Sequence, residues 1–130
     1  MDSKEKSIEG IVAEGKGEGA RFVSMQHYDQ AFFDKLGFRA YPGTLNVKTK
    51  IPVSLDLKKL KSIRISGFKA KEKTYGGVDC YPAKISGING AVIVPEFTGH
   101  GKEIIEFIAP VHLRTKLKLK NNDKVRIDLE

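Results

Sequence analysis

The stretch YGGVDCYPAKISGINGAVIVP, residues 75–95, decides the fold. Two apolar runs flank a short segment with Ser86, Gly87, Asn89 and Gly90, which are residues that favour a turn. The pattern predicts two β-strands joined by a tight connection. Because short strands of the same kind recur at close spacing along the chain, the sequence predicts a mainly β fold that closes into a small barrel.

The other predicted elements are separated by residues that favour turns. We expect further strands at 8–13, 20–25, 44–49, 62–68, 103–110 and 124–130. One helix is expected at 27–38 (HYDQAFFDKLGF), where apolar residues follow helical spacing and Gly37 provides a stop. A second short helix is expected within 109–119, after Pro110. The predicted fold is therefore all-β in the main, with one or two short helices.

Length and composition limit the class of protein. A chain of 130 residues, of which 40% are apolar, can bury one ordinary core, so we expect a single domain at 1–130 with a flexible N-terminus at 1–7. The 23 basic and 16 acidic residues give a net charge of +7, which favours an anionic partner. The single cysteine, Cys80, excludes an intramolecular disulfide, and no apolar run is long enough to cross a bilayer. We expect a cytoplasmic protein, monomeric and without a membrane partner.

The stretch EGKGEGARF, residues 14–22, places three glycines at alternate positions. Backbone N–H groups without bulky side chains can form a concave donor surface for phosphate oxygens, and Lys16 and Arg21 add positive charge. The pattern fits neither a Walker loop nor a dinucleotide fingerprint, because strands are expected on both sides of it. From the residues alone, a flexible hairpin turn with solvated charges is the more common explanation.

The segment YPGTLNVK, residues 41–48, places Thr44 and Asn46 two apart on a predicted strand, so both side chains face the same way. A hydroxyl and an amide oxygen are hard ligands, which suit magnesium. Neither is charged, so such a site makes sense where phosphates supply the negative charge. The simpler interpretation is that Thr44 caps the turn and Asn46 faces water.

The segment PEFTGHGKEIIEFIAPVHLR, residues 95–114, contains Glu106 within a run of Ile and Phe. A buried carboxylate is costly unless a group hydrogen-bonds to it, and an N–H group of a ligand is one such partner. An outward-facing position on a half-exposed strand is the alternative. His100 lies in the preceding loop and belongs to a residue type that titrates near neutrality, although a histidine on a surface loop is the more common explanation.

Together and in this order, these stretches resemble the archaeal CTP-dependent riboflavin kinases, from about Ile8 to Leu129. The segments that carry the resemblance are EGxVxxGxGEGxxF (9–22), LGFxxYPGTLNVK (36–48), GAVIVPxxTxH (90–100) and EIIExIAPxxLR (103–114). The resemblance implies a cradle-loop β-barrel that transfers the terminal phosphate of CTP to the 5′-hydroxyl of riboflavin, giving FMN and CDP. Some members of this family carry an N-terminal winged-helix domain, for which we expect no room before the first strand.

The resemblance also implies roles for individual residues. Thr44 and Asn46 match the Mg²⁺ ligands, and Thr98 and Glu106 match the flavin contacts. The residues that match the nucleotide contacts are Gly15, Lys16, Gly17, Glu18, Gly19, Ala20 and Arg21, together with Val111, His112, Leu113 and Arg114. Arg114 either meets phosphate or forms an ion pair with Glu103 or Glu106. No residue is assigned as a general base.

Two other functions compete with this one. A small barrel with basic stretches, KLKLKNNDKVR (116–126) and KAKEK (69–73), can bind nucleic acid through phosphates. Aromatic residues are not interleaved with these lysines, so stacking platforms are missing and no nucleic acid is expected. A barrel that binds flavin or nucleotide without turnover is the third possibility, although such a protein does not need the Thr44 and Asn46 pair.

Overall fold

The computed structural model describes residues 6–15, 23, 25–50, 57, 60–70, 72–96 and 103–130. Within these residues the chain forms nine strands and two helices. In chain order they are β1 (Lys6–Ala13), α2 (Gln26–Leu36), β2 (Leu45–Lys48), β3 (Ile63–Ile65), β4 (Phe68–Ala70), β5 (Lys73–Tyr75), β6 (Val78–Ile85), β7 (Ile88–Pro95), β8 (Ile104–Ile108), α4 (Leu113–Lys116) and β9 (Lys124–Leu129).

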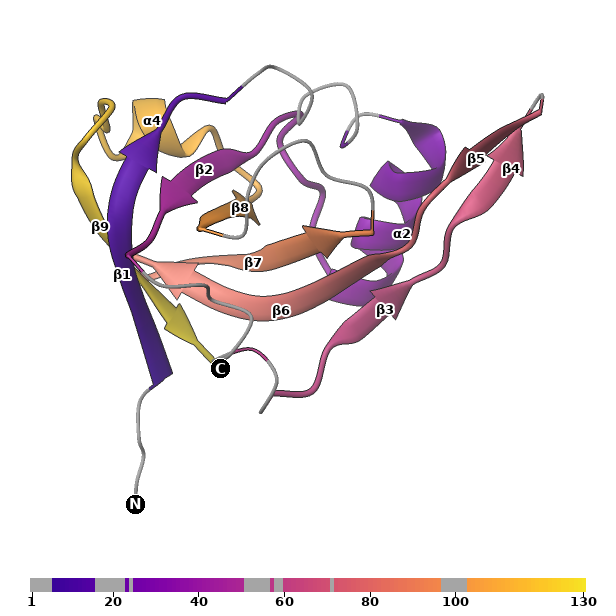
Figure 1. Ribbon diagram of the computed structural model, residues 1–130, viewed down its shortest axis with the longest axis horizontal. Coiled ribbons are helices and arrows are strands. Elements are labelled where there is room, and N and C mark those ends of the chain that lie inside the picture. Colours follow the sequence, from indigo (N-terminus) through magenta and orange to yellow (C-terminus); the bar gives the residue numbers. More distant parts are fainter. Residues whose placement is uncertain are drawn as a thin grey trace.

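Six of the strands form a closed ring (Figure 1). The antiparallel order β6-β7-β8-β2-β1-β9 closes because β9 also pairs with β6, with Ile127 opposite Ile85. Strand β3 continues the sheet beyond β6, and β4 and β5 form a separate two-stranded ribbon. The mainly β fold class predicted from the sequence is confirmed.

The hairpin of β6 and β7 is the long element of this ring. Ser86 and Gly87 connect the two strands with positive φ values of 50° and 79°, as the tight turns that match strand twist require. The register runs from the Ile85 and Ile88 pair to the Val78 and Pro95 pair. The local turn residues therefore produce the hairpin that the sequence predicts.

Alternation along the strands divides the buried side chains into two clusters. One cluster takes residues from all six strands of the ring, including Val47 and Phe107, and α4 adds Leu113 to it. The other lies on the opposite face and packs Tyr28 and Phe32 of α2 against residues such as Ile93. Because successive side chains of a strand point to opposite faces, Asn46 and Glu106 lie on the face away from the ring interior.

The helix predicted at 27–38 is confirmed as α2, which ends where Gly37 adopts φ 85° and donates its N–H to the carbonyl of Phe33. The second short helix, predicted within 109–119, is α4. At 20–25 the strand prediction is wrong for the described residues, since Val23 is helical and Met25 is the N-cap of α2. The side chain of Val23 is buried in the cluster that contains Tyr28 and Phe32 of α2. This tertiary contact overrides the preference of valine for strands.

Two further boundaries differ from the prediction. The strand expected at 62–68 is divided into β3 and β4, and Gly67 between them lies so close to the carbonyl of Tyr75 that a Cβ would overlap it. Strand β1 begins at Lys6, which pairs with Leu129, two residues earlier than the strand expected at 8–13. Neither described helix has the length and hydrophobicity of a membrane span.

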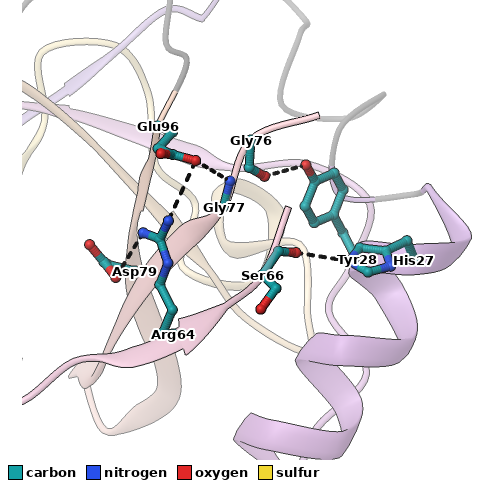
Figure 2. A network of polar contacts seen from close by, with 8 residues as sticks. All are labelled: His27, Tyr28, Arg64, Ser66, Gly76, Gly77, Asp79 and Glu96. Carbon is teal, nitrogen blue, oxygen red and sulfur yellow. Dashed lines mark hydrogen bonds and ion pairs between the residues drawn. The ribbon is translucent and has the colours of Figure 1, made fainter. Parts of the chain in front are cut away.

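A network of polar contacts joins the ends of β3, β6 and β7 beside α2 (Figure 2). Arg64 contacts Asp79 at 3.2 Å and Glu96 at 3.4 Å, and Glu96 accepts the N–H of Gly77 at 2.6 Å. The hydroxyl of Tyr28 donates to the carbonyl of Gly76 at 2.6 Å. These contacts fix the start of β6 and the end of β7 to α2.

Candidate functional site

A cavity of about 500 Å³ opens between α4 and the ends of β1 and β2. Three segments line it: the end of β1 with Glu14 and Gly15, residues 41–46, and residues of the stretch 107–114. Asn121, from the turn before β9, completes the lining. The segments come from distant parts of the sequence, and the ring brings them together.

Strand β2 is the centre of this arrangement because it pairs with both β1 and β8. Asn46 lies directly opposite Ala13 on one side and Glu106 on the other. Thr44, two residues earlier, donates a hydrogen bond of 3.2 Å from its Oγ1 to Oε1 of Glu106. The hydroxyl, the amide and the carboxylate therefore gather at one point of the sheet.

Glu106 is a buried carboxylate, with 9% of its surface exposed. It lies on the face of β8 that also carries Ile108, opposite Ile93 of β7. The cavity lining includes Thr44 and Asn46 but not Glu106, so the carboxylate is adjacent to the cavity and linked to it through Thr44. Glu106 does lie on the outer face of the ring, but its burial excludes the half-exposed position that the alternative assumed.

Gly15 and Asn46, which both line the cavity, are in close contact. A Cβ on Gly15 would overlap Nδ2 of Asn46 and lie 3.3 Å from its Cγ. The first glycine of the stretch therefore touches one of the two predicted metal ligands. Its lack of a side chain makes this approach possible.

Two aromatic rings stack at the rim. Tyr41 and His112 have ring centroids 4.8 Å apart with planes inclined by 28°. His112 is further fixed by a 2.7 Å hydrogen bond between its Nδ1 and Oγ1 of Thr115, and the N–H of Tyr41 donates to the carbonyl of Ala109. The wall of the cavity is therefore held in place by contacts on both of its segments.

Arg114 is the cation of the cavity lining, and its partners among the residues that the structure describes are uncharged. Its Nη2 donates to the carbonyl oxygen of Ala13 at 3.0 Å and to Oδ1 of Asn121 at 2.8 Å. Neutral acceptors orient a guanidinium without cancelling its charge. Of the two alternatives that the sequence left for Arg114, an ion pair with Glu103 or Glu106 is not among the contacts of the described residues.

The donor set near β2 fits a hard cation only if a ligand brings negative charge. In the part of the chain that the structure describes, no group of three His, Cys, Asp or Glu side chains is arranged to hold a metal ion. The Thr44 hydroxyl, just before β2, and the Asn46 amide, within it, offer neutral oxygen atoms in the lining of the cavity. Such oxygens suit Mg²⁺ bound together with phosphates.

The chain is similar to proteins of one known family. The model named CTP-dep_RFKase, described as "Domain of unknown function DUF120", matches residues 12–129. The chain belongs to the CTP-dependent riboflavin kinase family. The riboflavin kinase of Pyrobaculum aerophilum is 46% identical over 123 residues, which are 92% of this chain and 59% of that protein. The resemblance identified from the four segments is therefore confirmed.

Two more relatives are similar to the chain over nearly its whole length. The riboflavin kinase of Methanosarcina acetivorans is 44% identical over 121 residues, 91% of this chain and 51% of the relative. That of Archaeoglobus fulgidus is 41% identical over 125 residues, 94% of this chain and 54% of the relative. The chain thus spans about half the length of the curated relatives that it matches.

The structure brings together most of the described residues that the family resemblance assigns to ligands. The cavity lining contains Gly15, Thr44, Asn46, Val111, His112, Leu113 and Arg114. The predicted nucleotide contacts from Lys16 to Arg21, the predicted flavin contact Thr98, and His100 lie outside the described residues. The sequence reasoning missed Asn121, which lies in a lysine-rich stretch that resembles a solvated surface. Its only local signal is its place in a turn before the last strand.

Proposed function

We propose that this chain is the catalytic domain of a riboflavin kinase. It transfers the terminal phosphate of CTP to the 5′-hydroxyl of riboflavin and releases FMN and CDP. The observation that supports this most is the register of β2, which sets Asn46 opposite Glu106 and beside Gly15 at one cavity. A phosphate cradle, a pair of hard ligands and a buried carboxylate are the parts that the reaction needs, and Gly15, the described residue of the proposed cradle, lies beside the proposed ligand Asn46.

The nucleotide binds between the glycine stretch from Gly15 to Arg21 and the segment from Val111 to Arg114. Phosphoryl transfer depends on positioning and charge neutralisation, so a backbone cradle and a fixed guanidinium supply much of what the protein contributes. Arg114 carries its charge into the cavity because its protein partners are neutral. Backbone groups at 111–114 recognise the polar edge of cytosine.

Thr44 and Asn46 are the residues that would hold Mg²⁺. When bound, the ion neutralises negative charge on the phosphates of the nucleotide. Thr44 also hydrogen-bonds Glu106, so the residue at the metal position is in direct contact with the residue at the flavin position. This contact keeps the two substrates in register with each other.

Riboflavin binds with its ring N3–H donated to Glu106, and Thr98 contributes a second contact. A carboxylate offers about four lone-pair positions, so it can accept hydrogen bonds from more than one donor. Burial strengthens a hydrogen bond to this carboxylate because competing water is excluded. No general base is assigned, since a loose transition state needs little deprotonation of the attacking hydroxyl at the outset.

The enzyme acts as a cytoplasmic monomer with no nucleic-acid or membrane partner.

Product formation from riboflavin and Mg²⁺, with CTP and ATP supplied in parallel, tests the proposal. FMN from CTP but not from ATP is the expected result. FMN from ATP alone would support riboflavin kinase activity but contradict the proposed recognition of cytosine. No FMN from either donor, with salt-sensitive binding to DNA or RNA, would favour a nucleic-acid-binding module instead.

A further inference from the structure

The turn at 120–123 is fixed to the end of β1 by its backbone. The N–H of Val12 donates to the carbonyl of Asp123 at 2.8 Å, and the N–H of Asn122 donates to the carbonyl of Val12 at 2.7 Å. Within the turn, Oδ2 of Asp123 accepts the N–H of Lys120 at 2.8 Å. These bonds surround Asn121 in the sequence, so its backbone position at the cavity is defined.

The side chain of Asn121 determines where the guanidinium of Arg114 lies. Its Oδ1 accepts one hydrogen bond from Nη2 of Arg114 at 2.8 Å, and the carbonyl of Ala13 accepts another from the same nitrogen at 3.0 Å. Two acceptors on one nitrogen of a rigid planar group fix both its position and its plane. The guanidinium carries three more N–H donors, on Nε and Nη1, beyond the two on Nη2.

The amide character of Asn121 matters as much as its position. An aspartate here would make a charge-assisted hydrogen bond to Arg114, which is stronger than the present one, but it would also cancel the charge of the guanidinium. An asparagine supplies the same acceptor oxygen and leaves the charge intact. If the contact served only to hold α4 against the turn, aspartate would form the stronger hydrogen bond. A site that binds an anion instead requires the neutral amide.

We propose that Asn121 is a positioning residue that aims Arg114 at the polyphosphate of the nucleotide without neutralising it. The inference rests on the proposed function for the identity of the anion. It deepens that function by adding a residue outside the segments that the family resemblance assigns to ligands. It also links the anion site to the glycine stretch, because the carbonyl that shares Arg114 belongs to Ala13, two residues before Gly15.

The test compares Asn121→Asp with the wild-type chain for binding of inorganic tripolyphosphate, CTP and cytidine by calorimetry. We expect Asn121→Asp to weaken binding of tripolyphosphate and CTP by about tenfold or more, with cytidine binding and the melting temperature preserved. Asn89→Asp is the matched control, since Asn89 is exposed at the start of β7 and its variant adds the same charge away from the cavity. This control should bind all three ligands as the wild-type chain does.

A second variant keeps the inference falsifiable if Asn121→Asp unfolds. Asn121→Ala removes the acceptor without adding charge, so it should weaken tripolyphosphate binding by less than Arg114→Ala does, and it should add no further loss in the double variant. Unchanged tripolyphosphate binding in Asn121→Asp or Asn121→Ala overturns the inference, even if the chain makes FMN. If the wild-type chain makes no FMN but Asn121→Asp selectively weakens tripolyphosphate binding, the proposed function is wrong. The anion site at Arg114 is then still supported.

Discussion

The side chain of Asn46 fills the space that a Cβ would need at Gly15. The two residues belong to different strand ends, and the pairing of Ala13 with Asn46 brings them together. Glycine is needed here to make room for a neighbouring side chain. Gly15, the described residue of the proposed phosphate cradle, is thereby in contact with the proposed metal ligand Asn46, and a change at one is expected to act on the other.

Gly15→Ala should lower turnover while leaving the fold intact. The added methyl group forces the Asn46 amide to move, and a shift of about 1 Å in a group that positions a reaction can cost on the order of 100-fold in rate. Steady-state FMN production measures the loss. Because the amide is the end of a flexible side chain, the free energy of unfolding should fall by no more than about 1 kcal/mol.

A double-mutant cycle distinguishes this route from a direct effect on the backbone cradle. If Gly15→Ala acts by displacing Asn46, the variant with both Gly15→Ala and Asn46→Ala should be little worse than Asn46→Ala alone. Fully additive losses would show that the methyl group acts on the nucleotide and not through Asn46.

Asn46→Ala should reduce turnover far more than it reduces riboflavin binding. If the amide oxygen holds Mg²⁺, its removal costs on the order of 100-fold in the rate constant, and the Mg²⁺ concentration needed for half-maximal rate rises. Removing Mg²⁺ with a chelator should abolish turnover in the wild-type chain. Equal losses of turnover and of riboflavin affinity would count against a metal-holding role.

Local patterns in the sequence were enough to predict part of the fold and part of the candidate site. The turn residues Ser86 and Gly87 specify their hairpin, and the two-residue spacing of Thr44, just before β2, and Asn46, within it, agrees with their shared place in the cavity lining. The contact of Arg114 with Ala13 joins residues 101 positions apart, so no local pattern encodes it. The helical state of Val23 likewise depends on burial against α2. Pattern reasoning succeeds where neighbours in sequence decide, and it fails where tertiary contacts do.

Glu106→Gln should weaken riboflavin binding by roughly tenfold and leave CTP affinity nearly unchanged. Glutamine keeps an oxygen that can accept from Thr44, so the main change is the loss of the negative charge that would hold the N3–H of the flavin. Fluorescence titration of riboflavin measures the affinity. Glu103→Gln is the control, because Glu103 has an exposed side chain three residues earlier. A loss of CTP affinity with riboflavin affinity retained would show that Glu106 has been assigned to the wrong substrate.

The Cys80 thiol should make stability depend on pH in the alkaline range. Its side chain is fully buried in β6, and this burial, with a smaller contribution from the charge of Asp79, raises the pKa of the thiol from 9.0 to about 12. The folded state therefore holds the thiol proton more tightly than the unfolded state does. The associated stability is fully present below about pH 9 and is lost as the pH rises towards about 12.

Urea unfolding at pH 8, 9 and 10 measures this effect against Cys80→Ala, which lacks the titrating group. The wild-type chain should lose stability more steeply than the variant above pH 9, with the difference in slope approaching about 1.4 kcal/mol per pH unit. Other groups that titrate in this range are common to both chains, so they cancel in the difference. Parallel pH profiles would show that the thiol is not held protonated by burial, and the wild-type thiol should then also react with alkylating reagents in the folded state.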